Sequence, residues 1–359
     1  MTGGGIKASV IIVNYEGRAD LEDCLPSVCN QSIDDYEVIL VDNHSDDGSV
    51  AYVRDEFPEV RVIVNDENRW YAGGNNDGLA VAGGEYLVML NPDVEVDYEW
   101  LEQLLAPFED DDVAGTVGLT TSRIVKFDDR STLNTCGNRA HYTGLGFCRG
   151  LDEPVGSYPE RETVPAVSGS AFAMRRDVYE AIGGFDETFE MYYEDLDLSW
   201  QARLAGYDIL YVPESVVYHK YELEIPDWKL FNMERNRYLI LLKHLRRETL
   251  LRLLPGLLLT ELLVWVYAAL NGPAGLRKKA ASWGWLWANR EHVRQLRRET
   301  QERRERPDEE LVDEMDVGIP LDQFGITGVP HRLLAPVVRA GYAPWHGLAG
   351  GREPRSPNS

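Results

Sequence analysis

Residues 86–95 read YLVMLNPDVE, an apolar run of five residues that ends abruptly in a polar turn. A short, continuous apolar run of this kind is typical of a strand that is buried on both faces of a sheet. Asp93 and Glu95 follow two residues apart on an extended segment, so both carboxylates can point the same way. Two such carboxylates suit one hard divalent cation, although an Asn-Pro-Asp turn also closes a strand without any ligand.

The residues before this run repeat its pattern. Short β-branched runs alternate with segments of helical periodicity, which predicts strand-helix repeats and an α/β fold with a doubly wound, mostly parallel sheet. The expected strands cover residues 9–14, 37–41, 60–65 and 86–90, and the expected helices cover residues 21–29, 49–57 and 76–82. No G-x-G-x-x-G opens a helix after the first strand and no G-x-x-x-x-G-K-[ST] occurs, so neither a usual dinucleotide-binding fold nor a P-loop is supported.

Polar residues follow each predicted strand. Asn14 and Tyr15 end the first, Asp42 ends the second, and Asp93 follows the fourth. Because parallel sheets bind ligands beyond the carboxyl ends of their strands, we expect the chemistry at that edge. Asp42 could accept an N–H group of a nucleobase there, or it could serve only the turn that caps the next helix.

A second candidate site lies in the later part of the chain. Residues 172–174 predict a strand, residues 176–182 predict a helix, and a further helix opens at Glu194. Glu194 and Asp195 lie in its first turn, where the helix dipole by itself favours acidic side chains. The same dipole keeps Asp195 ionised, as a general base must be.

The composition is strongly acidic. The 359 residues include 36 basic and 60 acidic side chains, a formal net charge of −24, and 44% are hydrophobic, which excludes an unfolded acidic protein. Acidic surfaces stay hydrated when salt screens charge, so we expect a halophilic protein, the alternative being an ordinary acidic cytosolic one. The four cysteines have no zinc-type spacing and predict reduced thiols. Residues 1–7 have no apolar h-region, so a cytoplasmic protein is expected.

One segment is basic in this acidic chain. Residues 231–306 hold 16 basic and 7 acidic side chains and contain the apolar run 250–270, which is followed by a Trp-rich stretch. Charges and a Pro-Gly break within the run favour interfacial helices on a membrane surface over a spanning helix. A helical hairpin packed on the catalytic domain or on a partner subunit, including a homodimer, is the alternative. Nucleic acid is not expected as a partner, since aromatic interleaving is absent and the chain is acidic.

Seven motifs in fixed order resemble the family 2 glycosyltransferases, inverting enzymes with a GT-A fold, and among them the rhamnosyltransferase-like members of surface-glycan pathways. The resemblance covers residues 8–245. The motifs are VIIVNY (10–15), LVDNHSDDGS (40–49), NRWYAGGNNDGL (68–79), YLVMLNPDVEV (86–96), SGSAFAMRR (168–176), IGGFDETFEMYYEDLDLSWQARLAGY (182–207) and VVYH (216–219).

The resemblance implies a nucleotide-sugar donor and assigns residues to it. The implied donor-binding residues are Asn14, Tyr15 and Asp42 at the base and ribose, Asn68, Gly74 and Asn75 along the donor pocket, and Arg203 near the diphosphate. The chain would divide into a GT-A catalytic domain (1–245, with a nucleotide half at 8–120 and an acceptor half at 121–245), a helical arm (246–306) and an acidic, partly disordered tail (307–359).

The resemblance also implies a divalent cation, Mg²⁺ or Mn²⁺, and a catalytic base. Asp93 takes the place of the principal metal-binding aspartate, with His219 as an additional ligand. The family often has Asp-x-Asp where this chain has Asp93-Val94-Glu95, which puts the ligand role of Glu95 in doubt. Asp195, the second acid of the pair that begins with Glu194, would be the base.

The implied reaction is a single in-line displacement with inversion. The expected acceptor is a lipid-linked glycan precursor at the cytoplasmic face of the cell membrane, to which the protein binds peripherally through its arm. A processive polysaccharide synthase is a weaker reading, because Gln201-Ala202-Arg203 only superficially resembles the Q-x-x-R-W motif of those enzymes. A non-catalytic, nucleotide-sugar-binding scaffold of a glycan-assembly complex is the other alternative.

Overall fold

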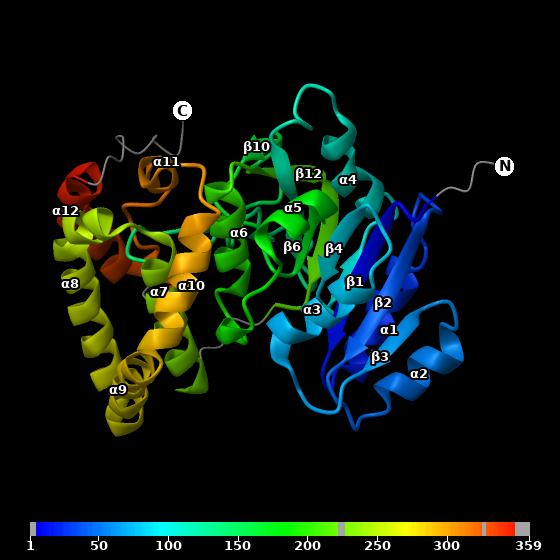
Figure 1. Cartoon of the computed structure of the whole chain (residues 1–359), viewed down its shortest axis with the longest axis horizontal. Helices are drawn as coiled ribbons and strands as arrows, with labels where there is room; N and C mark the ends of the chain where they lie inside the picture. The colour runs from blue at the N-terminus through cyan, green and yellow to red at the C-terminus, as the bar shows by residue number, and fades with distance from the viewer. Residues whose placement is uncertain (1–4, 222–226, 325–327, 349–359) are drawn as a thin grey trace. The chain divides into compact units, whose positions relative to one another are not determined.

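The computed structural model describes residues 5–221, 227–324 and 328–348 and divides into two compact units (Figure 1). The first, called here the sheet unit, comprises Met1–Asn138, Cys148–Ala202 and Gly206–Leu223. The second, called the helical unit, comprises Arg139–Phe147, Arg203–Ala205 and Glu224–Ser359. The domain boundaries expected from the sequence remain predictions.

The first part of the sheet unit follows the strand-helix alternation that the sequence predicts. Its strands are parallel, and β1 is hydrogen-bonded between β2 and β4. The elements are β1 (Ala8–Asn14), α1 (Arg18–Val28), β2 (Tyr36–Asp42), α2 (Ser49–Glu56), β3 (Arg61–Val64), α3 (Trp70–Val81) and β4 (Tyr86–Leu90). The predicted strand over residues 86–90 is confirmed at both ends.

The second part of the unit makes the sheet mixed. β11 lies antiparallel between β4 and β6, and β6 and β12 are parallel to each other. The carboxyl ends of β1, β2, β3, β4, β6 and β12 therefore lie at the same edge of the sheet. The elements are β5 (Val94–Val96), α4 (Trp100–Glu109), β6 (Val117–Lys126), β7 (Leu133–Thr135), β10 (Glu162–Thr163), β11 (Ala171–Arg175), α5 (Arg176–Ile182), η1 (Glu187–Phe189), α6 (Glu194–Leu204) and β12 (Asp208–His219). α6 continues into the helical unit at Arg203.

Helices cover both faces of this sheet because its strands are apolar on both sides. Val10 and Ile12 of β1 belong to one core cluster with Leu21 of α1 and Trp100 of α4. α3 lies on the opposite face, where Gly78 lets the helix backbone approach β1: a Cβ at Gly78 would lie 2.4 Å from Cγ2 of Ile11. The three layers are those of an α/β fold.

The helical unit contains most of a two-stranded hairpin, residues 139–147, and a set of packed helices. β8 (Asn138–Ala140) pairs with β9 (Gly146–Cys148), α7 packs on α9 and α10, and α8 packs on α9 and α12. The helices are α7 (Asp227–His244), α8 (Arg247–Leu270), α9 (Gly272–Ala288), α10 (Arg290–Glu302), α11 (Asp308–Asp313), η2 (Leu321–Phe324) and α12 (Gly328–Leu348). The end of the tail predicted to be disordered, residues 349–359, lies outside the described residues.

α8 has a property that bears on membranes. Within the described part of the chain it is the one helix long and apolar enough to cross a bilayer by length and composition, and 22% of its most apolar stretch is buried. Length and composition alone do not separate a spanning helix from an interfacial one.

Candidate functional site

The carboxyl edge of the sheet brings the first predicted residues together. Asn14 and Asp42 are register partners at the ends of β1 and β2, and both are fully buried. Asn14 Nδ2 donates to Asp42 Oδ2 at 2.8 Å and to Ser45 Oγ at 3.2 Å, and Asp42 Oδ1 accepts from the backbone N–H of Ser45 at 2.9 Å. Asn14 Oδ1 is buried without a hydrogen-bond partner, so it retains an acceptor for another group.

The other donor residues predicted from the sequence have mixed surroundings. Tyr15 is 54% exposed beside Asn14. Asn68 Oδ1 accepts from the N–H of Trp70 at 2.8 Å, and Asn75 Nδ2 donates to the carbonyl oxygen of Tyr71 at 2.9 Å. Gly74 is pressed on β1, since a Cβ there would lie 2.7 Å from Cγ1 of Val13. Their contacts with a donor remain predictions.

Asp93 and His219 lie close together in the fold, although 125 residues separate them in the chain. β5 pairs with the end of β12, which aligns His219 with Val94 and leaves His219 Nε2 3.3 Å from Asp93 Oδ2. The other ring nitrogen, Nδ1, lies 2.8 Å from Asn134 Oδ1. Burial would raise the pKa of Asp93, but the hydrogen bond and the charge of His219 outweigh it and lower that pKa below its ordinary value.

This pair has the donor chemistry of a metal site. Asp93 Oδ1 is buried and has no hydrogen-bond partner. If Nδ1 of His219 donates to Asn134 Oδ1, its Nε2 either donates to Asp93 as an imidazolium or offers a lone pair to a cation. Carboxylate oxygen and imidazole nitrogen are both ligands for Mn²⁺-type cations, so the residues fit a divalent metal.

Glu95 is engaged elsewhere. Its carboxylate accepts from Arg130 Nη2 at 2.7 Å, and the Arg130 guanidinium lies 3.9 Å from the centroid of the Tyr218 ring. Among the residues that the structure describes, no three His, Cys, Asp or Glu side chains are grouped as a metal set. The role of Glu95 as a second ligand remains a prediction.

Asp195 is held by three donors at the start of α6. Its Oδ1 accepts from Leu196 N at 2.7 Å, and its Oδ2 accepts from Gly169 N at 3.1 Å and from Asn138 Nδ2 at 3.0 Å. Burial raises the pKa of Asp195 above its ordinary value, and these hydrogen bonds limit the rise. Hydrogen bonds accepted by a carboxylate favour its ionised form, which is the form that a base needs.

Glu194 has the opposite surroundings. It is buried, and its Oε2 has no hydrogen-bond partner. Burial, and then the charge of Asp195, raise the pKa of Glu194 well above its ordinary value. Of the two neighbours, Asp195 therefore has the surroundings that favour the ionised form more.

The segment before α6 is strained. Glu190, Tyr192 and Tyr193 have φ values of 59°, 69° and 71°, in the left-handed region that non-glycine residues rarely adopt. Such strain persists only where the surrounding structure imposes it, and it clusters at functional sites. It fixes the entry of the chain into the turn that carries Glu194 and Asp195.

Two residues that the sequence did not single out complete this group. Asn138 binds Asp195 from the end of a two-stranded hairpin, and Tyr71 Oη donates to the carbonyl oxygen of Gly169 at 2.6 Å. Burial, with the charges of Glu194 and Asp195, raises the pKa of Tyr71 well above 10, so it remains a donor. Tyr71 lies within the quoted 68–79 motif, whereas no local pattern marks Asn138.

Arg203 lies at the opposite end of α6, within the helical unit. Its guanidinium forms an ion pair with Glu314 of the same unit, and its side chain is 6% exposed. This contact accounts for one face of the guanidinium, and the predicted role of Arg203 near a diphosphate remains a prediction.

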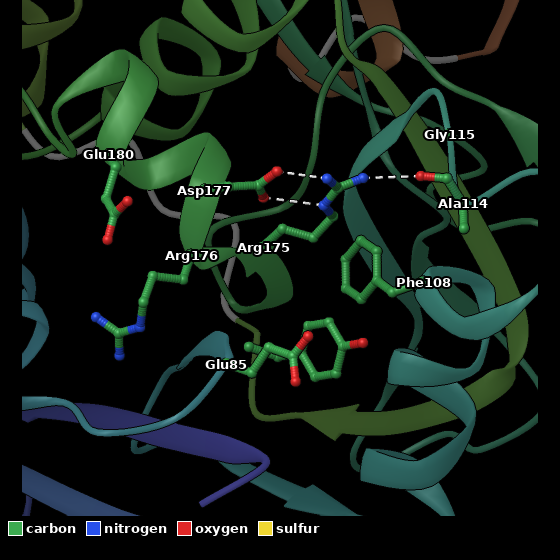
Figure 2. A pocket seen from close by; sticks show the side chains of 9 residues that line it. Glu85, Phe108, Ala114, Gly115, Arg175, Arg176, Asp177 and Glu180 are labelled. Atoms are coloured by element: carbon green, nitrogen blue, oxygen red, sulfur yellow. Dashed lines mark hydrogen bonds and ion pairs between the residues drawn. The ribbon is translucent and has the colours of Figure 1, made fainter. Parts of the chain in front are cut away.

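Figure 2 shows an open pocket of about 640 Å³ in the sheet unit. It lies at the amino end of β4, because Tyr86 and its register partner Arg175 line it, and the candidate metal ligand Asp93 follows the other end of that strand. Arg175 donates to Asp177 and to the carbonyl oxygen of Ala114. Its charge is thus already compensated by protein groups.

Comparisons with known families agree on one class of protein. The model described as "Glycosyl transferase family 2" matches residues 9–183, and the model described as "Glycosyl transferase family group 2" matches residues 147–287. Both models include Gly169; the first also includes Asn14, Asp42 and Asp93, and the second also includes Asp195 and His219.

Curated relatives are similar over part of their length. The chain is 31% identical over 188 residues to a pre-mycofactocin glycosyltransferase of Mycobacterium tuberculosis, covering 51% of this chain and 38% of the relative. It is 26% identical over 233 residues to N-acetylglucosaminyl-diphospho-decaprenol L-rhamnosyltransferase of the same organism, covering 58% and 75%. It is 24% identical over 208 residues to the low-salt glycan biosynthesis hexosyltransferase Agl10 of Haloferax volcanii, covering 56% and 63%.

Solved structures share the fold. The crystal structure of S. aureus TarS 1-349 aligns with a TM-score of 0.53 and 15% identity over 96% of this chain and 90% of that one. That of GalNAc-T7 with UDP, GalNAc and Mn²⁺ aligns with a TM-score of 0.53 and 20% identity over 67% and 48%. The α/β architecture with a mixed central sheet is that of the GT-A glycosyltransferases, as the sequence predicted.

Proposed function

The chain carries a glycosyl transferase family 2 domain, and on that premise we propose that it is an inverting transferase. It moves a sugar from a nucleoside diphosphate sugar to a hydroxyl group of a growing, lipid-linked surface glycan. The observation that carries this proposal is the Asp195 carboxylate, which is held by Gly169 N, Leu196 N and Asn138 Nδ2 beside the buried Glu194.

The proposed reaction is a single displacement. Asp195 Oδ2 or Oδ1 takes the proton of the acceptor hydroxyl, the acceptor oxygen attacks the anomeric carbon, and the nucleoside diphosphate leaves from the opposite face. One displacement inverts the anomeric configuration. The hydrogen bonds from Gly169 and Asn138 hold the carboxylate in one orientation, so that little reorganisation accompanies the proton transfer.

The donor binds at the carboxyl edge of β1 and β2 in this proposal. Asn14 and Asp42 present acceptor oxygens to the base, and the exposed Tyr15 lies beside them. Asp93, with its unpartnered Oδ1, and His219 would hold a divalent cation, Mn²⁺ or Mg²⁺. When bound, such a cation neutralises the charge of the departing diphosphate. Support comes from the GalNAc-T7 structure, which contains UDP and Mn²⁺.

We place the acceptor at the cytoplasmic face of the cell membrane. The mycobacterial rhamnosyltransferase is named for a decaprenyl diphosphate-linked acceptor, and the Haloferax relative for glycan biosynthesis. α8 supplies an apolar helix in this chain, and the protein would bind the membrane peripherally.

The first test is donor turnover. The purified chain is incubated with UDP-, GDP- and dTDP-sugars in the presence of Mn²⁺, Mg²⁺ or EDTA, and nucleoside diphosphate release is measured. Release of one nucleoside diphosphate that EDTA abolishes would support the transferase. A folded chain that binds and turns over none of the donors would instead favour the non-catalytic scaffold.

The base assignment is tested by Asp195→Asn. The amide keeps the shape but cannot accept the acceptor proton, so kcat for glycosyl transfer should fall by about 10²- to 10⁴-fold. Asp197→Asn is a matched control in the same helix, because the Asp197 carboxylate accepts from Gln201 Nε2 at 2.8 Å. If Asp195→Asn kept turnover within a fewfold of the parent, another group would have to be the base.

A further inference from the structure

α8 exposes a continuous apolar band. The α8 band, as we call it, consists of residues that recur at intervals of three or four along the whole helix, and all are exposed. Its members are Leu251 (69% exposed), Leu254 (44%), Leu258 (60%), Leu262 (61%), Val266 (50%) and Leu270 (83%). The helix of 24 residues is about 36 Å long, so the band far exceeds scattered surface leucines.

The one acidic residue in the middle of α8 does not interrupt this band. Glu261 is directed into the helical unit, where it pairs with Arg237 at 3.1 Å and with Lys279 at 2.9 Å and accepts from Tyr238 Oη. Glu234 pairs with the same two cations, whose side chains are 1% and 0% exposed. This charge tetrad of two acids and two bases has no net charge, so Glu261 needs no water.

Exposed amphipathic and cationic side chains also occur on α9 and α10. Trp283 and Trp287 on α9 are 48% and 75% exposed, and Trp283 Nε1 donates to Tyr238 Oη at 2.8 Å. Arg277 on α9 and Arg294 on α10 are exposed, and the sequence of α9 contains no acidic residue. Tryptophan favours the boundary between headgroups and acyl chains, and arginine favours anionic headgroups.

The packing of the unit favours an orientation in the plane of the membrane over a spanning one. α8 packs on α9, and α9 packs on α7 and α10. α10 is rich in exposed arginine and glutamate, so a spanning α8 would bring charged side chains into hydrocarbon with it. An in-plane helix inserts only its apolar face.

We propose that the α8 band inserts in the plane of a bilayer that contains anionic lipid, with Trp287 at the headgroup level and arginines of α9 and α10 on the headgroups. This rests on the proposed function only for the location of the acceptor. The α8 band is complementary to acyl chains, and the exposed arginines of α9 and α10 are complementary to negative charge. An anionic lipid surface provides both.

The test uses the full chain and vesicles of phosphatidylcholine alone or with 30% phosphatidylglycerol, at a salt concentration at which circular dichroism shows a folded protein. The parent should sediment with the mixed vesicles. The double variant Leu258→Glu, Leu262→Glu should lose at least tenfold in the sedimented fraction. The matched control Ile6→Glu, Tyr98→Glu adds the same charge at exposed apolar residues of the sheet unit and should sediment like the parent.

Two further readouts keep the outcomes distinct. Lipids brominated near the headgroup should quench tryptophan fluorescence, and Trp287→Phe should remove a large part of that quenching. Donor hydrolysis without acceptor should be equal in parent and Leu258→Glu, Leu262→Glu, which separates this proposal from the catalytic one. The proposal would be overturned if the parent and the band variant sedimented equally, or if the parent did not sediment. It would also be overturned if the parent were a dimer and the band variant a monomer.

Discussion

Glu194 and Asp195 are adjacent in the chain, yet their surroundings favour the ionised form to different degrees. Asp195 accepts hydrogen bonds from Leu196, Gly169 and Asn138, whereas Glu194 Oε2 is buried with none. Two neighbouring carboxyl groups repel each other when both are ionised, so the one with hydrogen-bond donors is favoured as the ionised member. The order of these residues along α6 therefore matters as much as their type.

Glu194→Gln should stabilise the sheet unit at neutral pH. Because the pKa of Glu194 is raised in the folded state, its contribution to stability is fully present below the ordinary pKa of 4.5. That contribution is lost as the pH rises through the folded pKa. Glutamine mimics the protonated form, so the variant should gain about 1 kcal/mol or about 2–4 °C in melting temperature at pH 7.5. Differential scanning calorimetry at pH 4.5 and 7.5 should show the gain growing with pH; an equal or smaller gain at pH 7.5 would contradict it.

Asn138→Ala should change the pH profile of glycosyl transfer. The variant removes a donor to Asp195, so the pKa of Asp195 should rise and the acid limb of kcat should move to higher pH, with kcat near neutrality reduced about tenfold or more. Tyr71 and Cys148 also lie near Asp195, but burial raises the pKa of Tyr71 well above 10 and that of Cys148 to about 11, so neither titrates in the window.

Controls for Asn138 separate positioning from folding. Asn138→Asp places a like charge beside Asp195 and should move the acid limb further in the same direction. The KM for the donor should stay near the parental value in both variants. A uniform loss of kcat with an unmoved pH profile would show that Asn138 supports the fold and does not tune Asp195.

At the scale of elements, the strands expected from short apolar runs are observed, but β6 and β12 were not predicted, and one helix begins earlier than expected. The apolar runs gave β4 its observed ends, but the helix predicted over residues 76–82 begins at Trp70. The first turns of α3 were not predicted because Gly73 and Gly74 have a poor helix propensity. α3 needs Gly74 because its backbone lies against Val13 of β1 at that residue, whereas a Cβ at Gly73 would meet the side chain of Arg69; only the folded structure shows these contacts.

Gly78→Ala tests that close approach. The added Cβ would lie 2.4 Å from Cγ2 of Ile11, so the variant should lose about 1–3 kcal/mol of stability. Gly284→Ala in α9 is the matched control, because a Cβ there meets nothing within 4 Å and should be neutral or stabilise by up to about 1 kcal/mol. Urea denaturation followed by circular dichroism measures both; equal effects would show that α3 can shift away from β1.

The site was predictable where motifs end strands and was not predictable where a distant hairpin contributes. Strand ends made Asp42 and Asp93 candidates, and the motif order made Asp195 one; their roles remain predictions. The hydrogen bond from Asn138 could not be foreseen, because nothing in the periodicity of residues 131–150 fixes where a two-stranded hairpin ends. Arg203 lies in a recognised motif, yet no sequence pattern around Arg203 or Glu314 predicts that the two form an ion pair.

At the scale of the whole molecule, charge is distributed unevenly. Residues 1–230 contain 45 acidic and 16 basic side chains, while residues 231–306 are net positive. Acidic excess repels itself at low ionic strength, and the Debye length falls from about 10 Å at 0.1 M salt to about 3 Å at 1 M. We therefore expect the melting temperature to rise between 0.1 and 2 M KCl. A flat or falling melting temperature over that range would count against a halophilic protein.

The charge tetrad of Glu234, Arg237, Glu261 and Lys279 joins three helices, and its members balance only as a set. Losing one member leaves an uncompensated charge in the interior, a loss of about 3–5 kcal/mol, whereas losing an acid and a base together restores neutrality. Substitutions at these positions should therefore be correlated. Across descendants of this sequence, these four positions should change in acid-base pairs, and drift at position 261 should be matched at position 237 or 279.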